Sequence, residues 1–213
     1  MIQESTLLKE FFTDLQGALC RLLENVYHGV DVDEIQVVVA VDAAYRGDLM
    51  SVAAVKWDLK WGPLSEISFT CRPPHPYVPG LLFLREGPPM LHAIKRLGDG
   101  WQLLLVDAHG LLHPRRMGLA VFLGLILNKP SVGIAKSLLV GSERSGDDFG
   151  EVEVEGETLG YWFRLSGSRK FYASPGYVVS VQQIPEIIKK LGNTYPGALR
   201  FVDRLSKRAL KGF

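Results

Sequence analysis

Residues 35–71 read IQVVVAVDAAYRGDLMSVAAVKWDLKWGPLSEISFTC, and three strand-like segments follow one another in this stretch. Ile35–Tyr45 and Met50–Trp57 are apolar and rich in β-branched residues, and Leu64–Cys71 alternates in polarity. The links between these segments are short, whereas a parallel return would need a crossover of about a dozen residues. The sequence therefore predicts an antiparallel meander of three strands.

The next part of the chain predicts parallel strands beside this meander. A loop with four prolines at 72–80 is followed by an expected helix from about Arg85 to Leu97. Buried strands at Leu103–Asp107 and Ser131–Ala135 flank a helix near Met117–Leu127, which makes a βαβ pattern. This order of elements is that of a ribonuclease H-like fold, a mixed α/β sheet flanked by helices. Ligands of such sheets bind beyond the carboxyl ends of the parallel strands.

The remaining segments extend this core at both ends, and we expect a single domain over residues 1–213. Apolar residues at spacings of three and four predict an amphipathic helix over about 5–27. The central core spans about 35–136. A hairpin and two helices are expected over about 150–213.

Composition indicates a globular protein that is neutral overall. The 213 residues are 47% hydrophobic and 22% charged, with a net charge of +1. Residues 1–35 carry −5 and residues 186–213 carry +5, so the basic charge gathers near the C-terminus. This basic end is either a phosphate-facing surface or an ordinary solvated one.

Cysteine usage, the N-terminal sequence and the length of apolar runs bear on the compartment and on membrane association. Cys20 and Cys71 form neither a CxxC pair nor a disulfide framework, and no secretory signal is recognised, so we expect a cytoplasmic protein. The longest apolar run, Met117–Leu127, has eleven residues, well short of the roughly 20 that cross a bilayer.

Two aspartates predict a metal site. Asp42 lies inside the first strand, and Asp107 ends the buried strand LLLVD. If these strands are neighbours, the two carboxylates meet, and hard oxygen ligands of this kind suit Mg²⁺. Phosphodiester hydrolysis uses such sites. The alternative is that each aspartate only caps the segment after its strand.

Other polar residues cluster along the same edge. Glu86 is expected near the start of a helix, where it could simply be a dipole partner. His113 could be a metal ligand, a phosphate donor or a general acid. Arg115 and Arg116 are expected in the first turn of the next helix, a position that suits phosphate. Lys136 follows the strand at 131–135 and could neutralise a phosphate.

Three segments resemble the endonuclease V family, also called deoxyinosine 3′ endonucleases. Residues 76–86 read PYVPGLLFLRE, residues 107–118 read DAHGLLHPRRMG, and residues 130–136 read PSVGIAK. All three are similar to motifs of this family, in the same order and at suitable spacing. The resemblance runs from about Val38 to Lys136 and continues more weakly to the C-terminus. Ala108 stands where the family usually has glycine.

The resemblance implies roles for residues at these positions. The metal-binding acids would be Asp42, Glu86 and Asp107, with Asp203 as a further ligand, and His113 and Lys136 would assist at the scissile phosphate. Tyr77, held between Pro76 and Pro79, would be a wedge that replaces a flipped base. Backbone groups of Gly80, Leu82 and Gly110 would read hypoxanthine. Arg115 and Arg116 complete the substrate-binding set, together with Pro79.

The function implied by the resemblance is hydrolysis of the second phosphodiester bond 3′ to inosine. The cofactor would be Mg²⁺, for which Mn²⁺ would substitute, and the partner would be inosine-containing DNA and also RNA, bound by a monomer. Two alternatives stay open at this point. One is a non-catalytic nucleic-acid binding module of the same fold, and the other is a different ribonuclease H-like nuclease.

Overall fold

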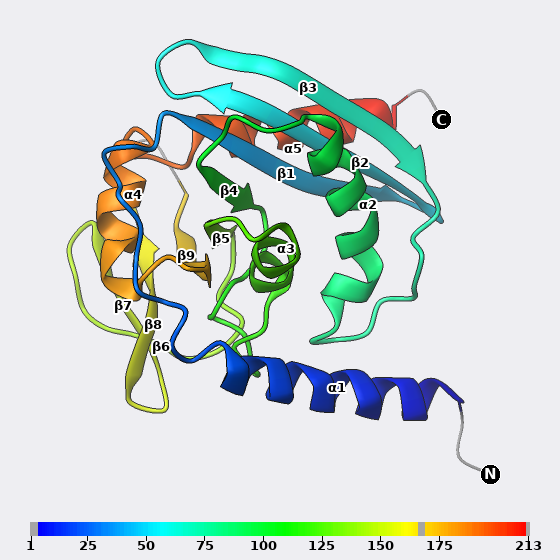
Figure 1. The fold of residues 1–213 in the computed structure, drawn as a ribbon, viewed down its shortest axis with the longest axis horizontal. Coiled ribbons are helices and arrows are strands. Elements are labelled where there is room, and N and C mark those ends of the chain that lie inside the picture. The colour runs from blue at the N-terminus through cyan, green and yellow to red at the C-terminus, as the bar shows by residue number, and fades with distance from the viewer. Residues whose placement is uncertain (1–3, 166–168, 212–213) are drawn as a thin grey trace.

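A nine-stranded mixed sheet forms the centre of the molecule (Figure 1). The computed structural model describes residues 4–165 and 169–211. The strands lie in the order β3-β2-β1-β4-β5-β9-β8-β7-β6. Their bounds are β1 Val37–Arg46, β2 Leu49–Asp58, β3 Gly62–Cys71, β4 Leu103–Val106, β5 Ser131–Ala135, β6 Ser142–Glu143, β7 Phe149–Val154, β8 Glu157–Phe163 and β9 Phe171–Tyr177.

The strand directions confirm the predicted ribonuclease H-like arrangement. β1, β2 and β3 pair antiparallel as a meander, and β1 pairs parallel with β4, which pairs parallel with β5. Val41 is opposite Val106 in the register of β1 and β4, and the N–H of Asp107 donates to the carbonyl of Val41 at 3.1 Å. The end of β4 therefore lies beside Val41, the residue before Asp42.

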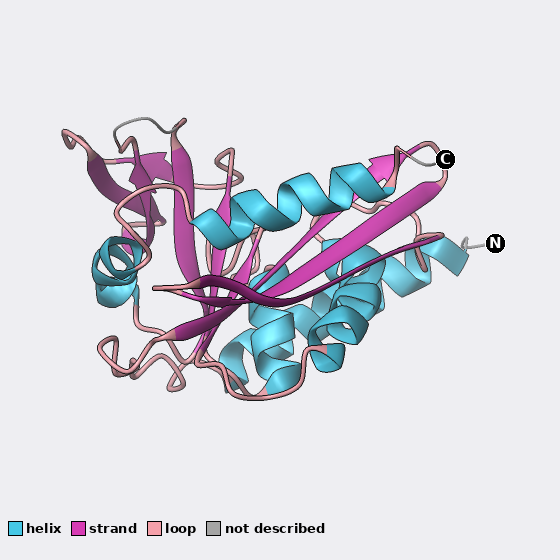
Figure 2. Cartoon of the chain, turned by 90° about the horizontal axis from the view of Figure 1, so that it is seen from above, coloured by secondary structure: helices cyan, strands magenta, loops and turns pink. Residues whose placement is uncertain are grey.

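Helices cover both faces of the sheet (Figure 2). The helices are α1 Glu4–Leu22, α2 Leu82–Arg96, α3 Leu119–Leu127, α4 Ile184–Lys190 and α5 Gly197–Ala209, with a short 3₁₀ helix at Val181–Gln183. None of these helices is long and apolar enough to cross a membrane; this applies to residues 4–165 and 169–211 only.

Alternation along β1 assigns its side chains to the two faces. Val39 and Val41 pack in the cluster that contains residues of α2 and α3, whereas Val38 and Ala40 pack in the cluster that contains residues of α4 and α5. Successive strand residues point to opposite faces. Asp42, two residues after Ala40, therefore faces α5.

Three expected boundaries are wrong. α1 ends at Leu22 instead of near 27, because the chain turns away to the sheet end, where the N–H of Gly29 donates to the carbonyl of Val178. α2 begins at Leu82 and α3 only at Leu119. Glu86 is therefore the fifth residue of its helix, not near the start.

Candidate active site

Three aspartates from distant parts of the chain meet at the carboxyl edge of the parallel strands. Asp42 belongs to β1, Asp107 directly follows β4, and Asp203 lies on α5. One carboxylate oxygen from each lies within 4.8 Å of the others. The predicted pairing of Asp42 with Asp107 follows from the parallel register of β1 and β4, and α5 adds the third carboxylate from the other side.

A buried serine holds α5 against β1 at this point. The Ser206 hydroxyl oxygen lies 2.9 Å from Oδ2 of Asp42, to which it can donate, and 3.1 Å from the carbonyl oxygen of Asp203. Ser206 is fully buried, three residues after Asp203 on the same face of α5. The sequence analysis missed this residue, although a serine among the apolar positions of an amphipathic helix is an available signal.

The protonation of Asp42 reflects its burial and the neighbouring carboxylates. Burial, together with the negative charge of Asp107, raises the pKa of Asp42 to about 7. Lys136 lies between two of the acids, with Nζ 2.5 Å from Oδ2 of Asp107 and 2.9 Å from Oδ1 of Asp203. Burial lowers the pKa of Lys136, but its hydrogen bonds and charge contacts with these two aspartates outweigh this, so the pKa lies above its ordinary value.

This donor set fits a divalent cation. Carboxylate oxygens are the ligands that Mg²⁺ and Mn²⁺ accept, and a cation would neutralise the mutual repulsion of the acids. The half-exposed side chain of Lys136 leaves the group open to solvent on one side. Asp42, Asp107 and Asp203 are therefore the residues that could hold a metal here.

Glu86 lies near this group, but the group found in the described residues consists of the three aspartates without it. It is buried on α2, and its Oε1 accepts a hydrogen bond of 2.8 Å from the Tyr45 hydroxyl. Burial raises the pKa of Glu86 to about 7, with a smaller contribution from the charge of Asp107. Glu86 is close enough to feel that charge, so it stays a proposed ligand.

A cavity of about 220 Å³ opens beside the aspartates, on the α2 and α3 side of the sheet. It is lined by residues of the proline-rich loop, of α2, of the loop after β4 and of the loop after β5: Tyr77, Pro79, Gly80, Leu82, Phe83, Ala108, His109, His113, Met117, Gly118, Leu119, Ser137 and Leu139. Five of the predicted site residues thus surround one cavity.

Gly110 has a different position from the one expected. Its N–H donates to the Ser174 hydroxyl at 3.1 Å, and its carbonyl accepts the N–H of Gly118 at 3.1 Å. A Cβ at Gly110 would collide with the backbone of Pro175. The expectation that Gly110 offers backbone groups to a base stays a prediction, and both groups already have a partner within the protein. This glycine lets the loop after β4 pack closely on β9.

Gln16 of α1 is a residue that the sequence analysis missed. Its buried side-chain amide donates to the carbonyl of Gly80 at 3.1 Å and to the carbonyl of Met117 at 3.0 Å. Arg115 Nε donates to Oε1 of Gln16 at 2.6 Å, and Arg115 Nη2 donates to the Gly80 carbonyl at 2.8 Å. Gln16 and Arg115 together fix one wall of the cavity.

The placement of the two arginines in a first helical turn is wrong. α3 starts at Leu119, after the extended residue Gly118, and Arg116 has a φ of 51°, in the left-handed region that a helix excludes. Arg116 pairs with Glu157 at 2.6 Å, and Arg115 is engaged with Gln16 and Gly80. Neither arginine belongs to the first turn of α3.

His113 lies in the cavity wall and is not part of the aspartate group found in the described residues. Its Nδ1 accepts the N–H of Arg115 at 3.2 Å, and its ring is hydrogen bonded to the backbone of Gly80. Burial lowers the pKa of His113 to about 4, so the imidazole is neutral at pH 7. The same cause lowers the pKa of His109 to about 4. Two neutral imidazoles therefore line the cavity.

Tyr77 stands at the cavity with its ring turned largely to solvent. The side chain is 63% exposed, an unusual position for a large aromatic residue, and the loop that carries it is restrained by prolines on both sides. An exposed, preordered ring beside a cavity is able to enter a nucleic-acid stack without a large ordering cost.

Comparison with known proteins gives one consistent family. A family model described as Endonuclease V matches residues 22–204. The chain is 35% identical over 204 residues to endonuclease V of Saccharolobus islandicus, which covers 96% of this chain and 97% of that protein. Both comparisons extend well beyond the central core to include most of the C-terminal region.

Solved structures agree with this result. The structure of endonuclease V from Streptomyces avermitilis is 28% identical, with a TM-score of 0.83 over 95% of this chain and 93% of that one. Endonuclease V from Ciona intestinalis, solved with a 24-mer DNA containing an inosine followed by a ribo-adenosine, has a TM-score of 0.84 at 19% identity and covers 96% of this chain and 98% of its own. The latter likeness concerns the fold alone.

Proposed function

The chain belongs to the endonuclease V family of nucleases, and from this premise we propose that it hydrolyses the second phosphodiester bond 3′ to inosine in a metal-dependent reaction. The observation that supports this most directly is the juxtaposition of three aspartates with a cavity and an exposed tyrosine. A hydrolytic centre, a pocket the shape of a base and a wedge are the parts that such a reaction requires.

Asp42, Asp107 and Asp203 would hold the metal, with Glu86 as the further acid. We propose Mg²⁺, with Mn²⁺ as a substitute, because all four groups are carboxylates. The ion would supply Lewis-acid activation of water and stabilisation of the charge that develops on the phosphate. Ser206 orients the Asp42 carboxylate, and Lys136 offers a mobile cation to the phosphate once the acids are neutralised.

The cavity is proposed to receive hypoxanthine. Leu82 is the first residue of α2, so its N–H has no carbonyl four residues earlier to bind, and no side chain caps this helix. A backbone N–H pairs with the O6 carbonyl of hypoxanthine and opposes the amino group of adenine. The neutral imidazole of His113 adds a polar group that carries no charge. The Ciona intestinalis protein was solved in complex with inosine-containing DNA, and we propose that the same class of nucleic acid is the substrate of this chain.

One chain supplies every group in this proposal, so we propose that a single copy acts as the enzyme and forms one domain around one sheet. RNA containing inosine is the second proposed substrate, and the same cleavage assay tests it. The acids at all the expected positions oppose the alternative of a non-catalytic binding module.

The experiment is a cleavage assay on an end-labelled oligonucleotide with one inosine, with Mg²⁺, and on the matched oligonucleotide with adenine. The expected product ends one nucleotide beyond the inosine on its 3′ side. Asp107→Asn should abolish cleavage and also the rise in melting temperature on adding Mg²⁺. Asp99→Asn, an exposed aspartate on the loop after α2, is the matched control. Equal cleavage by Asp107→Asn, or equal cleavage of inosine and adenine strands, contradicts the proposal.

A further inference from the structure

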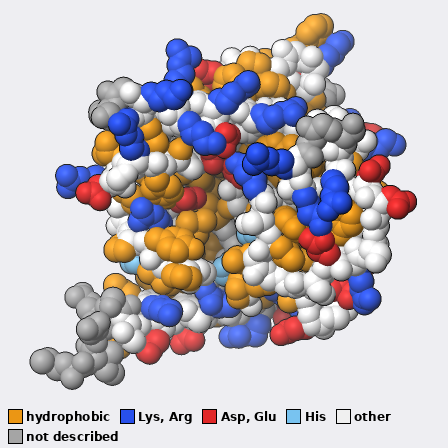
Figure 3. All heavy atoms as spheres, turned by 180° about the vertical axis from the view of Figure 1, so that it is seen from behind, with side chains coloured by type: hydrophobic (Ala, Val, Ile, Leu, Met, Phe, Trp, Pro, Cys, Tyr) orange, Lys and Arg blue, Asp and Glu red, His pale blue; other side chains and the backbone are white. Residues whose placement is uncertain are grey.

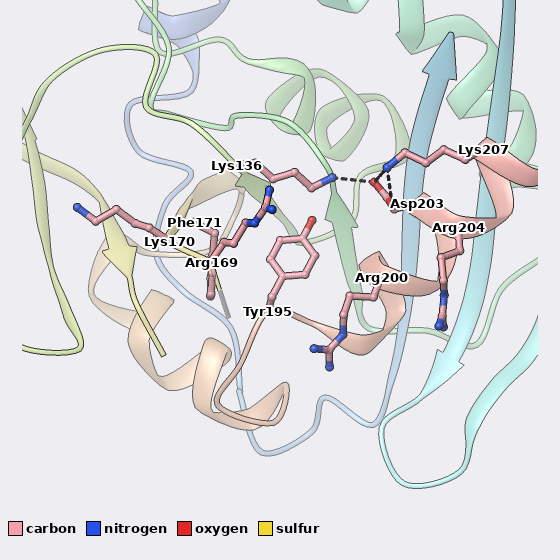
Figure 4. Close-up of a pocket in the computed structure, with 9 residues that line it drawn as sticks. All are labelled: Lys136, Arg169, Lys170, Phe171, Tyr195, Arg200, Asp203, Arg204 and Lys207. Carbon is pink, nitrogen blue, oxygen red and sulfur yellow. Dashed lines mark hydrogen bonds and ion pairs between the residues drawn. The ribbon is translucent and has the colours of Figure 1, made fainter. Parts of the chain in front are cut away.

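A second concave surface lies on the opposite face of the sheet from the base cavity. This basic groove, of about 550 Å³, lies between α5 and the start of β9 (Figure 4). Six of its lining side chains are cationic, and a single one is acidic, Asp203. The cations are Lys136, Arg169, Lys170, Arg200, Arg204 and Lys207.

Half of these cations have no acidic partner within residues 4–165 and 169–211. Lys136 and Lys207 contact Asp203, and Lys170 pairs with Glu143, whereas the exposed Arg169, Arg200 and Arg204 form no ion pair there. Arg200 and Arg204 are four residues apart on α5, a spacing at which like charges repel. Basic side chains also gather over the upper part of the rear face of the molecule, above a hollow (Figure 3). Such a surface is complementary to a polyanion.

The groove and the base cavity meet at the aspartates. Asp203 lines the groove, and Ala108, directly after Asp107, lines the cavity. The consecutive residues Lys136 and Ser137 line the groove and the cavity respectively. The cavity lies beside α2 and α3 and the groove beside α5, so the metal-binding acids lie between the two.

This arrangement assigns a direction to the bound strand. On the proposed function, the base occupies the cavity, and the cleaved bond lies on its 3′ side at the aspartates. A strand that continues in the same direction then enters the groove. We propose that the basic groove binds the sugar-phosphate backbone of the nucleotides 3′ to the cleaved bond, with Arg200 and Arg204 as phosphate ligands.

The floor of the groove indicates what kind of contact this is. Tyr195 and Phe171 are both buried, so they offer little ring surface for a base to stack on. Charged side chains at the rim contact phosphates and carry no sequence information. Binding of the 3′ nucleotides should therefore depend on salt and on length and be indifferent to base sequence.

The test uses single-stranded inosine oligonucleotides with a fixed 5′ arm and a 3′ arm of either two or ten nucleotides. Binding by fluorescence anisotropy and cleavage are measured in parallel on the wild type, on Arg200→Ala/Arg204→Ala and on the control Lys95→Ala/Arg96→Ala. The control removes two exposed cations from the last turn of α2. The long 3′ arm should lower the wild-type dissociation constant by about tenfold, and the α5 variant should lose this gain while the control keeps it.

Two further comparisons make the result specific. Lengthening the 5′ arm instead should affect wild type and α5 variant equally. The slope of log affinity against log salt should fall by about 1.4 in the α5 variant, at about 0.7 for each phosphate contact with a single strand. Two results overturn the proposal. One is that the α5 variant differs from the wild type in the affinity gained from a longer 5′ arm. The other is that the α5 variant keeps the affinity gained from the longer 3′ arm. If the wild type does not cleave the oligonucleotides but still binds the long 3′ arm more tightly, the proposed function is contradicted and the assignment of the groove stands.

Discussion

The side-chain amide of Gln16 donates a hydrogen bond of 3.1 Å to the carbonyl of Gly80, 64 residues later in the chain. Gly80 has a φ of 78°, and the Arg115 guanidinium occupies the space that a Cβ would take, so a side chain there would strain the backbone and displace the arginine. The first helix thus acts as a brace for the loop that carries Tyr77. The N-terminal segment, which has no acid or base in the reaction, still determines the shape of the cavity.

Gln16→Met should destabilise the fold and weaken base discrimination together. Met has similar length but makes none of the three hydrogen bonds of the amide, so the buried carbonyls of Gly80 and Met117 lose a donor. We expect a loss of about 1–3 kcal/mol in the free energy of unfolding. The ratio of inosine to adenine cleavage should also fall. Asp14→Met, at an exposed position of the same helix, should change neither, and unchanged discrimination in Gln16→Met would show that the brace is dispensable.

The contribution of Asp42 to the stability of the metal-free protein should fall as the pH rises from about 4 to about 7. Burial, with the charge of Asp107, raises the pKa of Asp42 from 3.8 to about 7, so the folded state binds a proton that the unfolded state has already lost in this range. Asp42→Asn has no such proton. In the presence of a chelator, we expect Asp42→Asn to add roughly 1–4 kcal/mol to the free energy of unfolding at pH 8 and much less at pH 4.

Chemical unfolding at these two pH values measures this difference. Glu86 contributes in the same direction, because burial also raises its pKa to about 7, and His109 and His113 contribute in the opposite direction, because burial lowers their pKa to about 4. These contributions are common to both proteins and cancel in the difference between wild type and Asp42→Asn. Asp99→Asn serves as the control with an exposed carboxylate. A difference between wild type and Asp42→Asn that is the same at pH 4 and pH 8 in chelator is the contrary outcome.

Lys136→Met should lower cleavage strongly and also destabilise the metal-free protein. The ammonium group lies between Asp107 and Asp203, so its removal leaves three carboxylates with less compensation. We expect cleavage at saturating Mg²⁺ to fall by about 10²-fold, the usual effect of removing one charge-stabilising donor. Lys136→Arg should stay closer to the wild type in metal-free stability than in cleavage rate. Lys95→Met is the matched control, and wild-type cleavage by Lys136→Met would exclude a role at the phosphate.

Tyr77→Ala should separate recognition from stability. The ring is 63% exposed, so its loss should change the free energy of unfolding by no more than about 0.5 kcal/mol. Discrimination between inosine and adenine should fall, because nothing then fills the gap in the stack. Tyr77→Phe should behave as wild type. Trp61→Ala, which removes an even more exposed ring from the β2–β3 turn, should have no effect on cleavage. A melting temperature lowered by several degrees in Tyr77→Ala would instead make this ring part of the fold.

Much of the fold was predictable because local patterns and connection lengths determine it. The buried runs that end in Asp42 and Asp107 are parallel neighbours, as their sequences indicated. The predicted start of α3 failed, since Gly118 is extended and Arg116 is left-handed, and neither conformation follows from periodicity. Gln16 and Ser206 have partners that lie 64 and 164 residues away, and a spacing pattern within one helix can mark a buried polar position but cannot identify its partner.

The position of Asp203 on the last helix has a consequence for the life of the chain during synthesis. While α5 is still inside the ribosomal exit tunnel, the emerged chain holds Asp42 and Asp107 but lacks the third carboxylate and the Ser206 hydroxyl that orients the first. A complete centre thus forms only when the last helix docks on the sheet. A chain whose α5 has not yet docked, close to messenger and ribosomal RNA, therefore does not carry the assembled group of three carboxylates.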